Sequence, residues 1–161
     1  MPANEPSTKD MLDHAERYFA LHAGQRMSHF SFFVVVAGTL GAAIAASLQL
    51  PKLLNLLGVG VGVLLAVTAF VFWKLDQRSA FLVKHAEDSL RQLEDSLPIS
   101  AARLFSLEPE RSREAIRTAP TPFLRMWTYG SAFRLMFWSM GLTGIIGAVL
   151  AWGRYAGWWT L

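Results

Sequence analysis

The sequence predicts an all-α membrane protein with three transmembrane helices and a cytosolic helical extension. Hydrophobic residues make up 53% of the chain, whereas charged residues make up only 17%. Asp, Glu, Lys and Arg are absent from three runs of 25, 21 and 19 residues, which are residues 27–51, 53–73 and 135–153. A helix of about 20 apolar residues crosses a hydrocarbon core of about 30 Å. A helix also satisfies its own backbone polar groups in lipid.

A soluble helical bundle is the alternative interpretation of these apolar runs. Helices in such bundles usually keep one polar face, which recurs with a period near 3.6 residues. Residues 59–71 and 140–151 are instead apolar or small on every side. The membrane interpretation is therefore preferred.

Residues 1–29 are predicted to form an N-terminal cytosolic amphipathic helix after a polar, Pro-containing start. Ser7 or Thr8 suits the N-cap position, and Asp10 is favourable in the first turn. The first apolar run is not expected to be a cleaved signal peptide, because a charged segment precedes it and it is longer than a typical signal core.

Residues 30–73 are predicted to form a transmembrane hairpin with spans at about 30–50 and 53–73. The connection Leu50-Pro51-Lys52 is so short that the two spans must be adjacent and antiparallel. Pro51 cannot continue the first helix, but it suits the first turn of the second.

Residues 74–131 are predicted to form a cytosolic helical region in which the second span continues as an amphipathic helix. Apolar residues recur there at heptad-like spacing and form a seam typical of helix pairing: Leu75, Leu82, Ala86, Leu90, Leu93 and Leu97. Pro98 is expected to end this helix. A third transmembrane helix at 133–152 and a periplasmic tail at 153–161 follow.

The distribution of basic residues predicts the orientation of the chain. Three Lys or Arg lie in residues 1–30 and ten in residues 74–134, which together are thirteen of the 15 in the chain. Basic segments stay on the cytoplasmic side of a membrane. The sequence therefore predicts a multi-pass protein of the bacterial inner membrane, with its N-terminus in the cytoplasm and its C-terminus in the periplasm.

Each predicted span carries small residues four positions apart, a pattern that lets helix backbones approach closely in lipid. These helix-packing or oligomerisation residues are Gly38, Ala42 and Ala46 in the first span, Gly58, Gly62 and Ala66 in the second, and Ser139, Thr143, Gly147 and Ala151 in the third. They serve either to hold one protomer together or to join several copies, and the sequence leaves both uses open.

The sequence offers no catalytic, cofactor-binding or metal-binding site, so a non-enzymatic protein is expected. There is no cysteine, and His22 and His29, which share a helix face, have no carboxylate beside them. The predicted span cores contain none of the ionisable residues that proton relays and coupling-ion sites need.

Arg78 and His85 resemble the Arg-x(4–6)-His motif of HEPN ribonucleases. The resemblance implies a membrane-tethered nuclease in which Arg78 holds the scissile phosphate and His85 acts as the acid or base. The alternative is that both are solvated residues on a helix surface, with Lys–Arg and Lys–Asp neighbours at helical spacing.

A basic cluster in the cytosolic region points to the membrane surface rather than to nucleic acid. Acidic residues are interleaved with its members, which are Arg103, Arg111, Arg113, Arg117 and Arg125. Contact with anionic lipid in the cytoplasmic leaflet is the simpler explanation. No nucleic-acid partner is therefore expected.

The chain resembles the RipA-like bacterial inner-membrane proteins and the related two-span SLATT modules. The likeness covers about residues 10–97: an amphipathic helix, Arg26, Phe32-Phe33 at the start of a tight hairpin, and a long returning helix. The resemblance implies an oligomeric scaffold or pore.

Three hypotheses follow for function. The first is a homo-oligomeric scaffold or regulated pore in the lipid bilayer, with a cytosolic helical domain that senses a signal or binds a protein partner. The second is an accessory subunit of a larger membrane complex. The third is the membrane-tethered nuclease with Arg78 and His85.

Overall fold

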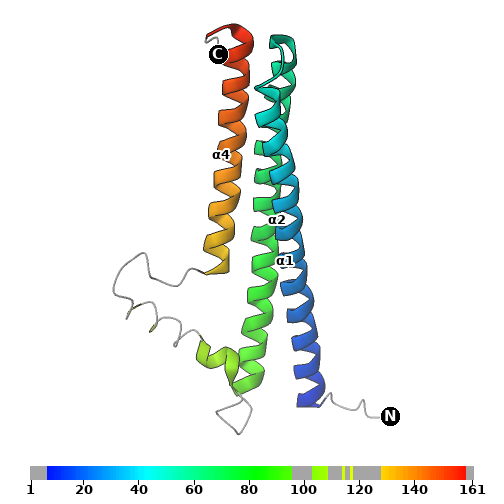
Figure 1. The fold of residues 1–161 in the computed structure, drawn as a ribbon. Coiled ribbons are helices and arrows are strands. Elements are labelled where there is room, and N and C mark those ends of the chain that lie inside the picture. Colours follow the sequence, from blue (N-terminus) through cyan, green and yellow to red (C-terminus); the bar gives the residue numbers. More distant parts are fainter. Residues whose placement is uncertain (1–6, 96–102, 109–113, 115–116, 118–127, 159–161) are drawn as a thin grey trace. The chain divides into compact units, whose positions relative to one another are not determined.

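A computed structural model of the chain describes residues 7–95, 103–108, 114, 117 and 128–158 (Figure 1). Its main elements are all helical: α1 (Thr8–Ser47), the 3-10 helix η1 (Lys52–Leu54), α2 (Asn55–Asp95) and α4 (Tyr129–Ala156). A short helical segment covers residues 104–108. The prediction of an all-α chain is confirmed for the described residues.

The chain divides into two compact units. Unit 1 comprises Met1–Arg26 and Arg78–Thr128, and unit 2 comprises Met27–Gln77 and Tyr129–Leu161. Helices α1 and α2 contribute to both units, whereas α4 belongs to unit 2 alone.

Three helices are long and apolar enough to cross a membrane, as the sequence predicts. Only 22% of the most apolar window of each helix is buried. The rest faces outward and includes large side chains such as Val35, Val67 and Ile145, each more than half exposed. An apolar surface of this extent is typical of contact with lipid or with other apolar helices.

The connection between α1 and α2 is longer than the predicted three residues. Helix α1 ends at Ser47, whose hydroxyl donates a 2.7 Å hydrogen bond to the carbonyl oxygen of Ile44. A turn follows, and Pro51 adopts an extended conformation with φ −54° and ψ 151°. Because Leu54 N–H donates to the Pro51 carbonyl oxygen at 2.8 Å, one 3-10 turn forms before α2 begins at Asn55.

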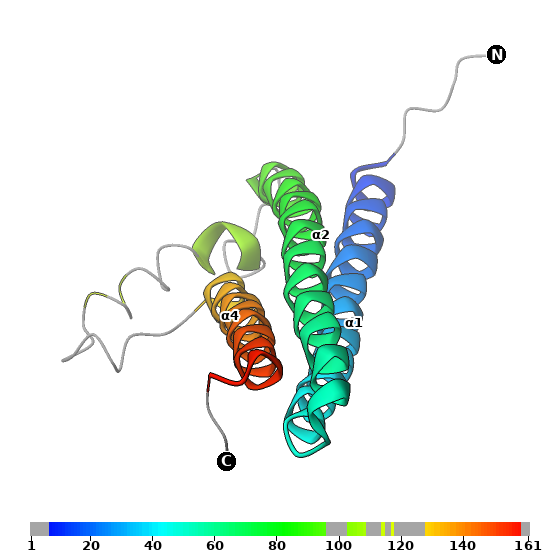
Figure 2. The same ribbon diagram turned by 90° about the horizontal axis from the view of Figure 1, so that it is seen from above.

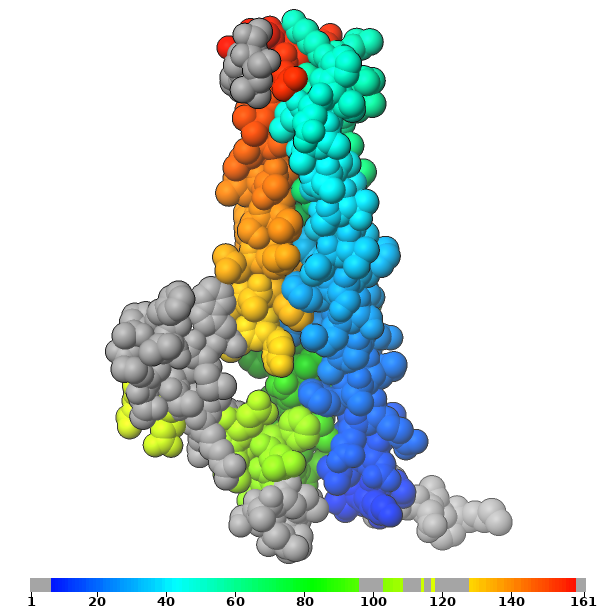
Figure 3. Space-filling model, viewed as in Figure 1, coloured from blue at the N-terminus to red at the C-terminus, as the bar shows by residue number. Residues whose placement is uncertain are grey.

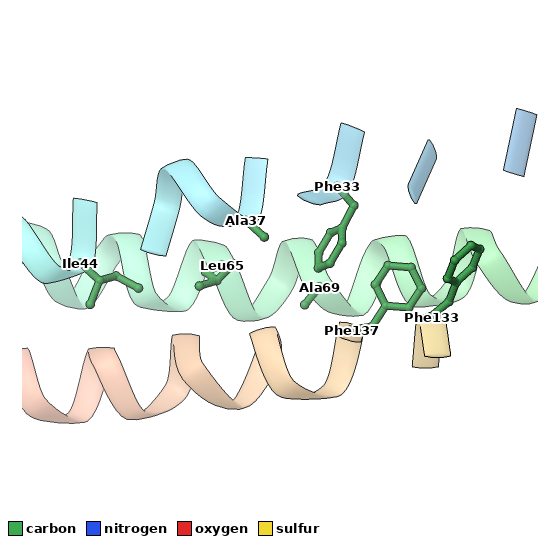
Figure 4. Packing of buried hydrophobic residues seen from close by; sticks show 7 residues of the cluster. All are labelled: Phe33, Ala37, Ile44, Leu65, Ala69, Phe133 and Phe137. Carbon is green, nitrogen blue, oxygen red and sulfur yellow. The ribbon is translucent and has the colours of Figure 1, made fainter. Parts of the chain in front are cut away.

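The core of unit 2 lies where its three helices meet (Figures 1 and 2). Seven buried side chains form it, as Figure 4 shows: Phe33, Ala37 and Ile44 from α1, Leu65 and Ala69 from α2, and Phe133 and Phe137 from α4. Ring contacts between α1 and α4 extend the core towards Tyr129, and the closest is a stacked pair of Phe30 and Phe133 with centroids 3.9 Å apart. These contacts fix the faces that α1, α2 and α4 turn towards one another.

Unit 1 is held together by a smaller set of contacts. Ala15 of α1 and Ala86 and Leu90 of α2 are buried. Phe19 of α1 meets Phe105 of the 104–108 segment edge to face, with ring centroids 5.3 Å apart. The segment therefore packs against α1 as well as being bound to α2, as described below.

Candidate functional site

Helices α2 and α4 touch through their backbones at two glycines. A Cβ atom on Gly62 would lie 2.6 Å from the carbonyl oxygen of Gly144, and a Cβ on Gly144 would lie 2.6 Å from the carbonyl oxygen of Gly62. Neither position has room for a side chain, which is the reason for small residues at such a crossing. Gly144 was not among the residues predicted for packing, because it lies outside the four-residue series of its helix.

Further small residues of α2 and α4 pack within unit 2, and two glycines face α1. Gly58 faces the side chain of Ser47, and a Cβ on Gly147 would lie 2.6 Å from Cγ2 of Ile44. Ala151 is fully buried, and Ala66 is half-buried beside the glycine crossing. Most of the predicted stripe on α2, and the second half of the stripe on α4, therefore pack within the protomer.

The small residues of α1 face outward instead. Gly38, Ala42 and Ala46 are exposed, and a Cβ on Gly38 would meet nothing within 4 Å. This exposed small-residue stripe lies on the opposite side of α1 from the core residues Phe33, Ala37 and Ile44. Figure 3 shows α1, in blue and cyan, lying open along one face.

Ser139 and Thr143, the first half of the α4 stripe, are also exposed. Thr143 Oγ1 donates to the Ser139 carbonyl oxygen at 2.9 Å, and Ser139 Oγ donates to the Met136 carbonyl oxygen at 3.0 Å. These hydroxyls are satisfied by their own helix. They can therefore face lipid without an unpaired donor.

The predicted apolar seam of α2 is partly used within unit 1. Ala86 and Leu90 are buried, and Leu82 and Leu93 are half-buried. Leu75 is 42% exposed, and Leu97 lies outside the described residues. The buried part of the seam is not open to a second copy.

A buried carboxylate anchors the 104–108 segment to α2. Glu94 is 3% exposed, and its two oxygens accept hydrogen bonds from the backbone N–H groups of Phe105 and Ser106 at 3.1 and 2.9 Å. The Ser106 hydroxyl also lies 3.1 Å from the carboxylate. A carboxylate at the first N–H groups of a helix satisfies donors that have no partner within the helix. Arg91 adds a 3.0 Å hydrogen bond from Nε to the Phe105 carbonyl oxygen.

Glu87 lies one helical turn before Arg91 and has an altered acidity. Burial raises the pKa of Glu87 from its ordinary value of 4.5, Arg91 lowers it, and Glu108 and Asp88 raise it further. Arg91 also pairs with Asp88, at 2.9 Å, and more distantly with Glu87, at 3.7 Å. Arg91 therefore interacts with both Asp88 and Glu87, and its charge does not offset the effect of burial on the pKa of Glu87.

Unit 1 has an open depression of about 490 Å³ between the start of α1 and the end of α2. Its lining combines polar and apolar residues, and it includes Asp10, Met11, His14, Ser89 and Gln92.

Arg78 and His85 both lie exposed on α2, separated by about 10 Å along the helix axis. His85 stacks on Phe81, with ring centroids 6.4 Å apart. Within the described residues, no three His, Asp or Glu side chains are placed to hold a metal ion. Of the basic cluster, Arg103 pairs with Asp95 at 4.0 Å, whereas Arg111, Arg113 and Arg125 lie outside the described residues.

Comparison with known proteins identifies one informative relative. No family model matches the chain, and no solved structure matches it. The chain is 36% identical over 137 residues to CD-NTase-associated protein 19 of Escherichia coli, an alignment that covers 85% of this chain and 87% of the relative. The chain therefore belongs to the family of CD-NTase-associated protein 19.

Proposed function

We propose that this chain is a non-enzymatic integral membrane protein that assembles with copies of itself and serves as the membrane component beside a CD-NTase. Helices α1, α2 and α4 cross the bacterial inner membrane, and the assembled spans form a scaffold or a regulated pore. Unit 1 lies in the cytoplasm and receives the partner.

The observation that carries self-association is the exposed small-residue stripe of α1. Gly62 and Gly144 are occupied by packing within the protomer, whereas the α1 stripe of Gly38, Ala42 and Ala46 is open. Small residues in a membrane helix favour close association with another helix. The described part of a single copy has three candidate spans, and these pack on a shared core. A pore therefore requires several copies.

The association with a CD-NTase is suggested by the name of the relative. That name describes a protein associated with a CD-NTase. In unit 1, the depression lined by Met11 and His14 is the surface proposed for such a contact. An accessory role in a larger membrane complex remains the second candidate, because the same name describes association without naming an activity.

The mass of the detergent-solubilised protein tests self-association. We expect a discrete assembly of several protomers for the wild type and a smaller species for Gly38→Leu, because the added side chain keeps a second helix away from the stripe. Gly60→Leu is the matched control, since Gly60 is equally open but lies outside the stripe. A monomeric wild type would contradict self-association and favour the accessory role.

Co-purification with a co-expressed CD-NTase tests the partner. Met11→Asp should reduce recovery of the enzyme, and Leu21→Asp, at an exposed position of the same helix outside the depression, should not. A catalytically inactive CD-NTase should be recovered as well as the active enzyme if the contact is direct. Equal recovery with both variants would place the contact elsewhere.

A further inference from the structure

An apolar groove runs between α2 and α4 on the outside of unit 2. Its volume is about 240 Å³. The buried side chains of Ala69 and Phe137 lie at its base, and the exposed side chains of Phe70 and Leu142 border it. Gly141 lies in its wall, where a Cβ atom would meet only Ala69, at an ordinary 3.6 Å. Because Gly141 has no side chain, the groove stays open at this position.

Two indole rings mark one end of the groove. The rings of Trp73 and Trp138 lie 5.6 Å apart, and both residues line the groove. The Trp73 Nε1–H group is buried and has no hydrogen-bond acceptor in the described part of the protein. Indole rings favour the boundary between hydrocarbon and headgroups, where the ring is in apolar surroundings and the N–H can meet an oxygen atom.

Two cations lie at the same end. Lys74 Nζ is 4.7 Å from the centre of the Trp73 ring, and it is 3.3 Å from Gln77 Oε1. Arg134 lies one helical turn before Trp138 and donates from Nε to the Gly130 carbonyl oxygen at 3.0 Å. Each cation keeps further N–H donors for an anion. The nearby carboxylate of Asp76 is buried, so the exposed charge at this end is positive.

We propose that this groove binds one anionic phospholipid, with an acyl chain between α2 and α4 and its phosphate at Lys74 and Arg134. An ester or phosphate oxygen supplies the acceptor that the Trp73 N–H group lacks. In the orientation proposed above, the lipid belongs to the cytoplasmic leaflet. Basic pockets between membrane helices on that side are typical lipid headgroup sites.

A second copy of the chain suits the groove less well than a lipid. Pairing two copies through the same surface would bring Lys74 and Arg134 of both copies together. The large side chains that border the groove also prevent the close backbone approach that favours helix association in membranes. The open small-residue stripe of α1 offers that approach instead.

Quenching of tryptophan fluorescence by brominated lipids tests the proposal on the full chain. Vesicles contain equal amounts of phosphatidylglycerol and phosphatidylcholine, and only the lipid that carries bromine changes, so the surface charge stays constant. We expect stronger quenching when phosphatidylglycerol is brominated, with a preference of about fivefold for each cation. Lys74→Gln/Arg134→Gln should remove the preference, and Gly141→Leu should reduce quenching by both lipids.

Matched variants separate this site from general effects. Lys52→Gln/Arg154→Gln removes the two basic residues near the opposite ends of the helices and should keep the preference; Gly60→Leu should keep the quenching. Equal quenching by both lipids in the wild type would overturn the proposal. The same conclusion would follow if both double variants behaved alike. A smaller assembly for Gly141→Leu with unchanged lipid quenching would also overturn it and would identify a second copy as the occupant.

Discussion

At the scale of single residues, unit 1 contains two carboxylates on one helix with different roles. Glu94 accepts hydrogen bonds from the backbone N–H groups of Phe105 and Ser106, and these bonds stabilise its buried negative charge. Glu87 is partly buried and shares Arg91 with Asp88, and burial raises its pKa. One carboxylate therefore holds the fold of unit 1, whereas the other opposes it when ionised.

Glu87→Gln is predicted to change how stability depends on pH. A folded-state pKa above the unfolded value of 4.5 means that the folded chain binds the proton more tightly. The stability contributed by protonated Glu87 is therefore present below pH 4.5 and is lost as the pH rises through the raised pKa. Between pH 4 and 7, the midpoint of thermal unfolding should fall less with rising pH for the variant than for the wild type. Parallel curves would contradict the assignment.

The role of Glu94 could not be predicted from the sequence. Its hydrogen-bond partners lie 11 and 12 residues further along the chain, beyond a helix end and a proline. A periodic pattern identifies the face of a helix, but it does not indicate where an irregular segment returns. Glu94 lies next to the seam residue Leu93, and an acidic residue at that position is typical of a solvated flank.

At the scale of helices, the two kinds of small-residue stripe have different uses. Gly62 of α2 and Gly144 of α4 allow the backbones to touch within the protomer, whereas the stripe of α1 faces outward. A four-residue spacing is the same in both cases. The spacing points to Gly62 but misses Gly144, and it could not assign each stripe to a partner, because that depends on how the helices are rotated about their axes.

Gly62→Leu is predicted to destabilise the protomer itself. A side chain at this position would meet the Gly144 carbonyl oxygen and the Ala148 backbone nitrogen, which cannot move aside as a flexible side chain can. Overpacking of this kind costs typically about 1–3 kcal/mol, and a backbone clash lies at the upper end. Thermal unfolding in detergent should show a lower midpoint for Gly62→Leu.

Gly60→Leu provides the matched control, since a Cβ atom at position 60 meets nothing within 4 Å. Its unfolding midpoint should stay near that of the wild type. If Gly62→Leu unfolded like the wild type and only changed the mass of the assembly, the contact of α2 with α4 would not be the one that holds the protomer.

The boundaries of the hairpin illustrate a second limit of sequence patterns. The run without charged residues continues to Pro51, so composition extends the first span past the end of α1 at Ser47. The hydroxyl of Ser47 and the restriction that Pro51 places on Leu50 act locally and favour an earlier end. Hydrophobicity predicts that a span exists, whereas local hydrogen bonding decides where it ends.

At the scale of the whole molecule, the absence of cysteine provides a direct test of orientation. Ser7→Cys and Lys52→Cys each introduce a single exposed thiol, at the start of α1 and at the hairpin. In intact cells, a membrane-impermeant maleimide should label only Lys52→Cys. Permeabilised cells should show labelling of both, because thirteen of the 15 basic residues favour a cytoplasmic N-terminus. Labelling of Ser7→Cys in intact cells would indicate the opposite orientation, with the N-terminus outside the cytoplasm.

The short connection between α1 and α2 has a consequence for how the protein is made. Only residues 48–54 separate the two helices, and Ser47 already faces Gly58 across the hairpin. Such a short connection keeps the two helices close together, so the first helix cannot easily enter the bilayer while the second stays in water. We therefore expect α1 and α2 to enter the bilayer together as a hairpin, and α4 to join them afterwards.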